Sequence, residues 1–263
     1  MLQTFNYHAH TKRCGHAVGE DEEYVLEAIK NGYRQIGFSD HAPYTNDHTP
    51  GERMDKEDFY TYVDSVRKLQ EKYQDQIEIR LGLEIEYYTN RMEDLKEYRK
   101  VCDYIIIGQH DAGLHERDFY ESNTDEDVLE YARLICTACE DGLVDIIAHP
   151  DLFMFSKPGW SKACEKATRM LCECACKHKI PLEINLAGLR YGKKQIGDEY
   201  RYTYPYRAFW QIASEYPIQA IYGLDAHAPE KYADFKCFDI VNEEILYNLD
   251  IPMLKELSFV SKK

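Results

Sequence analysis

Histidine and acidic side chains occur in short groups along the whole chain. The groups are His8-Ala9-His10, Asp40-His41, Glu84-Ile85-Glu86, His110-Asp111, His149-Pro150-Asp151 and Asp225-Ala226-His227. Alternating residues of a strand share a face, so the first and last groups each present two side chains to one cavity. Neutral imidazole binds zinc, iron and manganese, and carboxylates can bridge two metals. Crowded imidazoles without metal would repel on protonation, so the pattern predicts a cluster of divalent cations.

Each group lies at the end of a short apolar run, or within one. The runs cover residues 4–7, 35–38, 78–85, 104–107, 144–148, 182–186 and 220–224. Helical periodicity separates them, at 20–31, 56–73, 91–100, 125–141, 161–177 and 206–215, with a last helix at 238–247. Apolar strands that alternate with helices are typical of a parallel sheet covered by helices. The sequence therefore predicts an α/β fold, either a closed or nearly closed barrel of seven strands or an open doubly wound sheet.

The strand ends explain why distant groups can meet. In an α/β barrel the carboxyl ends of all strands share one rim, where active sites are assembled. Six of the ten histidines follow strands of the predicted barrel at this rim. We therefore expect the ligand-type residues to converge there.

Composition narrows the class of protein. The 263 residues include 47 acidic and 32 basic ones, which gives a formal net charge of −15. This charge argues against a nucleic-acid partner.

No apolar run is long enough to cross a bilayer, and the first residues lack an apolar signal core, so we expect no membrane partner and a cytoplasmic location. Nine scattered cysteines favour reduced thiols over a disulfide framework. We interpret Cys136 and Cys139 as buried helix thiols, and Cys172, Cys174 and Cys176 as a mixture of core packing and surface positions without a shared role. The absence of repeats and linkers favours one domain over residues 1–263.

Seven segments carry a family resemblance. In order along the chain they are YHAHTKRCGHA, FSDHAP, GLEIEY, GQHD, AHPDL, EINLAGLRYG and GLDAHAP. They resemble the polymerase and histidinol phosphatase (PHP) superfamily, and within it the monofunctional histidinol-phosphatase branch. The resemblance covers essentially the whole chain. It implies a distorted seven-stranded (β/α)7 barrel of the TIM type, with a trinuclear metal site.

The resemblance also implies which residues bind metal. Nine positions hold the residue types that the family uses: His8, His10, Glu84 and Asp225 for one cation, Glu84 as a bridge to a second that His110 and His149 complete, and His16, His41 and His227 for a third. Mixed imidazole and carboxylate ligands accept zinc, manganese or iron. We expect two to three divalent ions, whose identity the ligands leave open.

The activity implied by the resemblance is hydrolysis of L-histidinol phosphate to L-histidinol and phosphate, a step of histidine biosynthesis. A metal-activated water would be the nucleophile. The alternative is a PHP-family phosphoesterase that acts on another small phosphate ester or a nucleotide. A silent metal-binding protein is disfavoured, because a structural site usually closes a single tetrahedral ion. An amide or lactone hydrolase is disfavoured because no lysine stands at a strand end.

Further residues are candidates for catalysis and substrate binding. Asp225 and His227 are the catalytic candidates of the last strand, and Asp225 or a metal-held water could protonate the leaving group. Arg190 is predicted to contact phosphate, because the planar guanidinium matches a pair of phosphate oxygens. Lys12 is a second cationic candidate, and Glu86 could pair with the ammonium of histidinol.

For four residues the sequence leaves alternatives open. Asn185 would either contact substrate or cap the end of its strand. Asp40, Asp111 and Asp151 would either accept hydrogen bonds from ligand imidazoles or cap the helices that follow.

Overall fold

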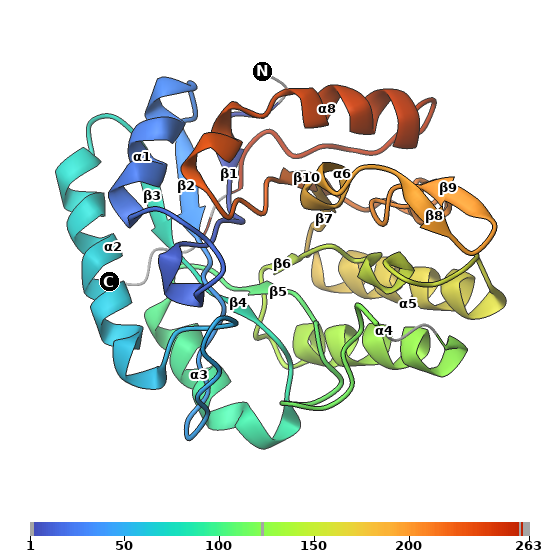
Figure 1. Ribbon diagram of the computed structural model, residues 1–263, viewed down its shortest axis with the longest axis horizontal. Helices are drawn as coiled ribbons and strands as arrows, with labels where there is room; N and C mark the ends of the chain where they lie inside the picture. The colour runs from blue at the N-terminus through green and yellow to red at the C-terminus, as the bar shows by residue number, and fades with distance from the viewer. Residues whose placement is uncertain (1–2, 122–123, 258, 260–263) are drawn as a thin grey trace.

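Parallel strands form the centre of the molecule. The structure is a computed structural model that describes residues 3–121, 124–257 and 259. One sheet has the order β1 (Phe5–Asn6), β2 (Gln35–Phe38), β3 (Glu78–Leu81). The other has the order β10 (Ala220–Gly223), β7 (Leu182–Asn185), β6 (Ile146–Ile147), β5 (Ile106–Ile107), β4 (Glu84–Ile85). All pairs within these two sheets are parallel, as the sequence predicts for an α/β fold (Figure 1).

Single parallel bridges connect the two sheets at both junctions. Ala9 bridges Ala226, where the amide of His10 donates to the carbonyl of Ala226 at 2.8 Å. His41 bridges Glu84, and the amide of Ala42 donates to the carbonyl of Glu84 at 2.8 Å. The α/β class is confirmed, whereas closure into one barrel sheet stays a prediction. Both bridges lie beside candidate metal ligands.

The predicted strand 78–85 is two strands, β3 and β4, and the buried ring of Tyr104 lies at the break. A Cβ on Gly82 would lie 2.4 Å from this ring, and one on Gly37 would lie 2.2 Å from its hydroxyl. The hydroxyl donates toward the carbonyls of Tyr7 and Phe38, at 2.7 and 3.0 Å. A side chain distant in sequence thus occupies the space beside both glycines.

Most helices lie where periodicity predicts them. These are α1 (Asp21–Lys30), α2 (Phe59–Tyr73), α3 (Met92–Val101), α4 (Asp125–Glu140), α5 (Lys162–His178) and α7 (Arg207–Ala213). The predicted last helix is α8 (Lys236–Ile240) followed by a π-helical turn (Val241–Ile245). Short α6 (Ala187–Arg190) and the antiparallel hairpin of β8 (Lys194–Ile196) and β9 (Glu199–Arg201) were not predicted. Short 3-10 helices cover Lys12–Cys14, Lys56–Asp58, Thr89–Arg91, Leu152–Met154 and Pro229–Ala233.

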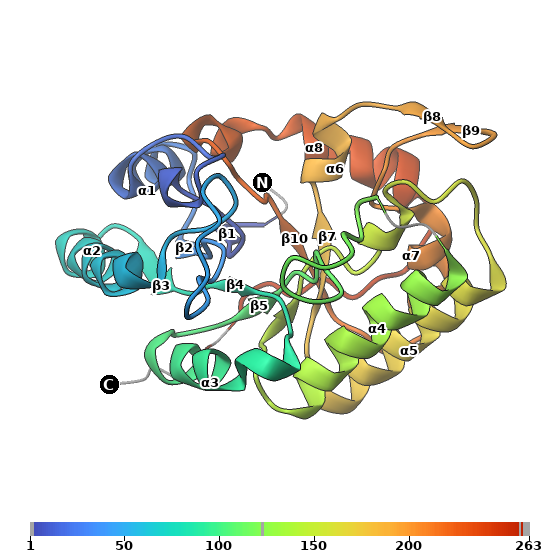
Figure 2. The same cartoon turned by 60° about the horizontal axis from the view of Figure 1, so that its bottom comes forward.

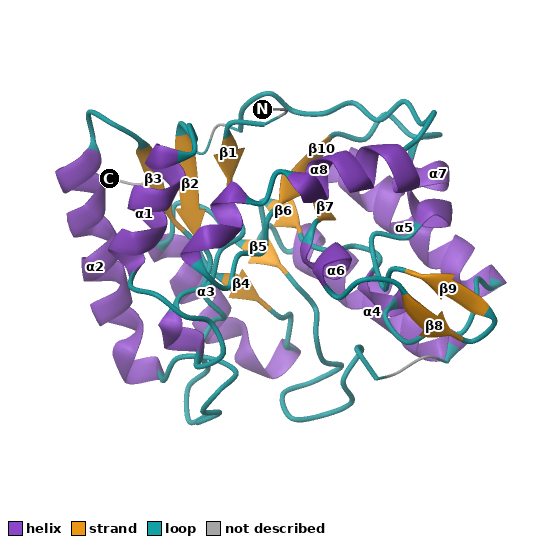
Figure 3. Cartoon of the chain, turned by 45° about the horizontal axis from the view of Figure 1, so that its top comes forward, coloured by secondary structure: helices purple, strands orange, loops and turns teal. Residues whose placement is uncertain are grey.

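The helices surround the strands, so that both strand faces are buried (Figures 2 and 3). Ile107 and Ile147 belong to the main core together with helix residues. Their neighbours Ile106 and Ile146 belong to a second apolar cluster with Tyr7, Tyr104 and Ile221, which Leu254 and Leu257 cover. Alternate residues of one strand therefore enter two different cores. Among the described residues, none of the helices has the length and hydropathy needed to cross a membrane.

Candidate metal centre

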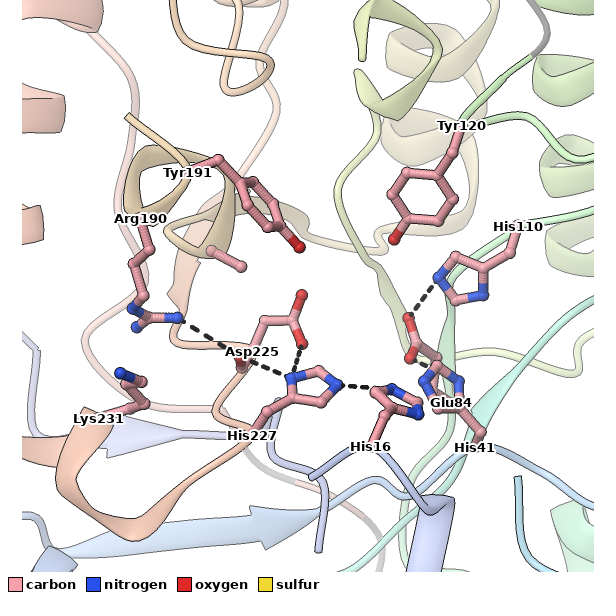
Figure 4. Close-up of a pocket in the computed structure, with 11 residues that line it drawn as sticks. His16, His41, Glu84, His110, Tyr120, Arg190, Tyr191, Asp225, His227 and Lys231 are labelled. Carbon is pink, nitrogen blue, oxygen red and sulfur yellow. Dashed lines mark hydrogen bonds and ion pairs between the residues drawn. The ribbon is translucent and has the colours of Figure 1, made fainter. Parts of the chain in front are cut away.

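The ligand-type residues meet around one cavity of about 330 Å³ (Figure 4). Its lining includes His16, His41, Glu84, His110, Tyr120, Arg190, Tyr191, Asp225, His227 and Lys231. They come from the carboxyl ends of several strands and from the loops that follow, as the predicted rim requires. Buried His8, His10 and His149 lie directly beneath this lining, against Glu84.

The first group of ligand atoms is formed by the two strands at the Ala9–Ala226 bridge and by Glu84. The Nε2 atoms of His8 and His10 are 3.0 Å apart. Oε2 of Glu84 lies 3.4 and 3.3 Å from these nitrogens. Oδ1 of Asp225 lies 3.5 and 3.4 Å from them. Four ligand atoms thus surround one point in the manner of a cation site.

Glu84 also faces a second group through its other oxygen. Oε1 of Glu84 lies 3.0 Å from Nε2 of His149 and 3.6 Å from Nε2 of His110. A carboxylate with one oxygen toward each group can bridge two cations. The structure therefore brings together the residues that the resemblance assigns to two adjacent sites.

A third group lies at the mouth of the cavity. His16, His41 and His227 offer nitrogen atoms within 4.8 Å of one another, and the Nε2 atoms of His16 and His227 are 3.0 Å apart. Nδ1 of His41 lies 3.2 Å from Oε2 of Glu84, which connects this group to the first. Cys14 Sγ, which the sequence did not single out as a ligand, also lies within 4.8 Å of ligand nitrogens of His10 and His227.

The surroundings of the cavity shift the pKa values of its carboxyls and imidazoles in different directions. Burial opposes ionisation of Glu84 and Asp225, but the facing imidazoles, His8 foremost, hold the pKa of both carboxyls well below their usual range. Burial, and next the charge of His227, lowers the pKa of His10 to about 3. Burial opposes protonation of His8 and His110 as well, but Glu183, Asp225 and Glu84 raise the pKa of His8 well above its usual value, and Glu84 and Glu86 raise that of His110 to about 9. A bound cation would displace these protons, because it needs ionised carboxylate and neutral imidazole as ligands.

Two buried carboxylates orient ligand histidines from behind. Oε1 of Glu183 lies 2.8 Å from Nδ1 of His8, and its Oε2 accepts from the amide of His149 at 3.1 Å. Oε1 of Glu86 lies 2.9 Å from Nδ1 of His110, and Oε2 accepts from buried Arg53 at 3.0 Å. Such partners fix the tautomer of the imidazole and leave Nε2 free for metal. Glu86, predicted to bind substrate, is thus engaged by protein groups in this structure.

The roles of Glu183 and Arg53 behind the ligand histidines were not predicted from the sequence. Glu183 stands inside an apolar run and alternates with Asn185, so its side chain points the same way as that residue. A lone carboxylate within a buried strand was the available signal. No sequence signal pointed to Arg53, because its partner Glu86 is 33 positions away in sequence.

Asn185 contacts the protein rather than open cavity. Its Nδ2 donates to Oε2 of Glu183 at 3.0 Å and to Oδ2 of Asp225 at 3.2 Å. Its Oδ1 accepts from the amide of Ala187 at 2.8 Å. These contacts position Asp225 and start α6.

Four other candidates are tied to protein groups by the contacts of the described residues. Lys12 is exposed, pairs with Glu20, and is not among the described residues that line the cavity. Asp40 accepts from the amide of Thr11 at 2.7 Å, and Asp151 accepts from the amide of Tyr206 at 2.6 Å. Asp111 accepts from the hydroxyl of Tyr88 at 3.3 Å. These aspartates hold the loops around the cavity.

Arg190 lines the cavity next to Asp225. Its Nη1 donates to the carbonyl of Leu224 at 2.7 Å, and its Nε to Oδ2 of Asp234 at 3.1 Å. Nη2 is buried and has no hydrogen-bond partner among the described residues. Lys231 lines the same side. The guanidinium of Arg190 is held in place and keeps one unpaired donor, and it lies on the same side as the ammonium of Lys231. This arrangement suits an anionic ligand.

The backbone is strained at two candidate ligands. Asp225 has φ +46° and His149 has φ +26°, in the left-handed region that residues with a Cβ seldom occupy. Such strain is typical of functional sites, where surrounding contacts hold the conformation. At Asp225 the contacts of Asn185 and His8 do so.

The chemistry of the donor set fits divalent cations. Buried Nδ1 atoms of His10 and His149 and Oδ1 of Asp225 have no hydrogen-bond partner among the described residues. Pairs of imidazole nitrogens 3.0 Å apart can share at most one proton, whereas a cation would attract every donor in the group. Imidazole with carboxylate suits zinc, manganese and iron.

Comparisons with known proteins show related sequences and a related fold. A probable histidinol-phosphatase of Deinococcus radiodurans is 26% identical over 245 residues, 90% of this chain and 90% of that protein. A probable phosphatase of Shewanella amazonensis is 26% identical over 84% of this chain and 75% of that protein. The crystal structure of histidinol phosphate phosphatase from Lactococcus lactis, complexed with zinc, L-histidinol and phosphate, matches with a TM-score of 0.72. At 17% identity, over 97% of this chain and 96% of that one, it shows a common fold.

The family assignment comes from a sequence profile. Residues 6–187 match the PHP domain, which is more than half of the 263 residues. The matched range begins in β1 and contains β2 to β7. It includes every ligand-type residue described above except Asp225 and His227. The chain belongs to the PHP domain family.

Proposed function

We propose that this protein is a metal-dependent phosphomonoesterase that hydrolyses L-histidinol phosphate to L-histidinol and phosphate. The observation that carries the proposal is the convergence of nine ligand-type side chains on one cavity beside Arg190. The relatives support the substrate, because several are described as histidinol-phosphatases. Zinc, manganese or iron would occupy the centre, with two to three ions per chain.

The residues of the cavity would have different roles in the hydrolysis of a phosphate ester. Bound cations would lower the pKa of a water molecule and neutralise charge on the phosphoryl oxygens. Arg190 offers the unpaired Nη2 to a phosphoryl oxygen and so fixes the orientation of the ester. The carbonyl oxygen of Asp225 lies 3.2 Å from Nδ1 of His227 and so orients that imidazole. The hydroxyls of two tyrosines point into the cavity, that of Tyr191 from the side of Arg190 and that of Tyr120 from the side of His110 (Figure 4).

A neighbouring acidic pocket supports a cationic substrate. It has about 270 Å³, shares His16, His41, His110 and Tyr120 with the metal cavity, and is further lined by Glu52, Arg53, Glu86, Asp111 and Asp118. Histidinol carries an ammonium and an imidazole besides the phosphate ester. The carboxylates of this pocket would pair with the ammonium and the imidazole of histidinol, while the phosphate lies beside Arg190 in the adjoining metal cavity.

Replacing Asp118 with asparagine is expected to raise KM for histidinol phosphate about tenfold, because one charge-assisted contact of about 1.4 kcal/mol is lost. Asparagine keeps an acceptor for the amide of Tyr120, which Asp118 now bonds at 2.6 Å. KM for p-nitrophenyl phosphate, whose aromatic group carries no positive charge, should stay unchanged. Steady-state kinetics with both esters check this, and an equal rise for both would refute the cationic subsite.

Replacing Arg190 with alanine is expected to lower kcat/KM about 100-fold without loss of metal, because a positioned donor to the phosphoryl group disappears. Arg190→Lys keeps the charge without the fork and should recover part of the activity. Lys193→Ala is the matched control, since Lys193 pairs with Glu244 outside the metal cavity. Unchanged kinetics in Arg190→Ala, with metal measured by elemental analysis, would disprove the phosphate contact.

A phosphate-release screen tests the function itself. Purified protein loaded with zinc, manganese or iron is assayed against histidinol phosphate, other small monoesters, nucleotides and oligonucleotides. We expect the highest kcat/KM with histidinol phosphate. A higher value with a nucleotide or another ester would favour the alternative, a PHP-family phosphoesterase of different specificity.

We further infer one catalytic domain over residues 1–263, with a distorted seven-stranded barrel. The bridges at Ala9 and His41 support the barrel, because they connect the two sheets at both junctions. The second apolar cluster also supports it, since alternate residues of four strands meet there. Nine free thiols favour a reducing compartment such as the cytoplasm.

A further inference from the structure

A second group of potential metal ligands lies between α4 and α5, away from the cavity. Cys136 and Cys139 are three residues apart on α4, so their side chains share one helix face. Sγ of Cys136 donates to the carbonyl oxygen of Met170 on α5 at 3.7 Å, and Cys174 follows Met170 by one turn of that helix. The thiol of Cys174 thus faces α4, where both other thiols influence its ionisation. Its sulfur is also 3.9 Å from the carbonyl oxygen of Cys136. Three thiols from two helices therefore meet at one point, which the sequence interpretation as separate helix thiols did not foresee.

His178 supplies a fourth donor at the same place. It follows Cys174 by four residues on α5, so the two side chains lie one above the other on one face. Nε2 of His178 is buried and has no hydrogen-bond partner among the described residues.

The position of this group favours a cation. α4 and α5 lie side by side, and their last turns are adjacent, because Lys177 pairs with Glu140 at 3.2 Å (Figures 1 and 2). The carboxyl ends of two helices carry partial negative charge toward this point. Cys139 and Cys174 are buried, so a bound ion would be shielded from solvent.

We propose that Cys136, Cys139, Cys174 and His178 bind one zinc ion in a tetrahedral site that joins α4 to α5. Three thiolates and one imidazole form a common zinc ligand set, and the spacing of two residues between Cys136 and Cys139 is typical of it. Each thiol releases its proton to solvent when the ion binds. None of the four residues is among the described residues that line the metal cavity or the acidic pocket.

Such an ion would stabilise the part of the fold that presents two candidate ligands of the metal centre. α4 follows β5 and the loop that carries His110, and α5 follows β6 and His149. Fixing the ends of both helices limits their movement against the strands. The site is therefore structural, and the chemistry of the cavity does not depend on its sulfur atoms.

Cobalt(II) is the probe that separates this site from the catalytic centre. Thiolate ligands give cobalt an intense near-ultraviolet charge-transfer band, which imidazole and carboxylate ligands do not give. Titration of the reduced, full-length protein should produce this band with one equivalent of ion. Cys139→Ser and Cys174→Ser should each weaken or abolish it, and both variants should still release phosphate.

Two controls make the result specific. Cys164→Ser changes a buried thiol in the first turn of α5, about 15 Å from Cys174 along the helix, and should keep the band. Cys14→Ser removes the sulfur near the catalytic histidines and should keep it as well. His178→Gln, at a partly exposed position, should retain the band but weaken cobalt binding about tenfold or more.

The proposal is overturned by absence of the band in the reduced wild-type protein, or by its loss in Cys14→Ser alone. A disulfide between Cys174 and a cysteine of α4 that persists in the presence of reductant and prevents cobalt binding would also overturn it.

Discussion

Replacing Glu84 with glutamine should lower kcat/KM by about 10³-fold or more and reduce the bound metal. Oε2 of Glu84 lies 3.2 to 3.4 Å from nitrogens of His8, His10 and His41, and Oε1 lies 3.0 Å from His149. Glutamine turns an NH2 group toward one of these sets, and that group cannot bind a cation. Metals contribute several kcal/mol of charge stabilisation, and about 1.36 kcal/mol corresponds to a tenfold change in rate.

Elemental analysis and phosphate release check this together. Wild-type protein should hold about two to three divalent ions per chain in the catalytic centre, in keeping with a multi-metal site. Glu84→Gln should hold at least one ion fewer. Glu71→Gln, on the exposed side of α2, is the matched control and should resemble the wild type. Full metal content with lost activity would show that Glu84 acts in another way than as a ligand.

The candidate site was predictable because it is built from local patterns at strand ends. His8 and His10 alternate on one strand, and so do Asp225 and His227 at the end of another; such pairs are readable without knowing the fold. The barrel rule then places the pairs at one rim. Convergence on Glu84 follows from these two steps, and the structure shows it at distances below 4 Å.

The partners behind the ligands were not predictable in the same way. Glu183 contacts His8 over 175 positions of sequence, and Arg53 contacts Glu86 over 33. Nothing local distinguishes a buried carboxylate that orients an imidazole from one that binds substrate. Glu86 illustrates this, because its place on the strand predicts only that it faces the cavity.

The fold shows the same division between local and distant causes. Long helices such as α4 and α5 follow from periodicity and from caps such as Thr124 and Ser161, whose side chains accept from the amides of Asp127 and Cys164. The break between β3 and β4 depends on Tyr104, which is remote in sequence from Gly37 and adjacent to Gly82 only in space. The hydrophobic periodicity of the sequence cannot predict a contact between residues so far apart in the chain.

Replacing Gly108 with alanine should disable the centre without removing any polar group. A Cβ at this position would lie 1.8 Å from Oε1 of Glu84 and 2.9 Å from Nε2 of His149. The methyl group therefore displaces the carboxylate that faces two groups of ligands. Misplacement of a reacting group by about 1 Å can cost about 100-fold, so we expect kcat/KM to fall by at least that factor, with a loss of bound metal.

Gly159→Ala is the matched control for Gly108→Ala. Gly159 has nothing within 4 Å of an added Cβ, so the same substitution there should leave kinetics and metal content unchanged. Circular dichroism of both variants separates a local effect from unfolding, because overpacking costs about 1–3 kcal/mol, less than a typical domain's stability. Full activity in Gly108→Ala would mean that Glu84 can leave its place at no cost. A bridging ligand could not do so, and the assignment of the centre would then be wrong.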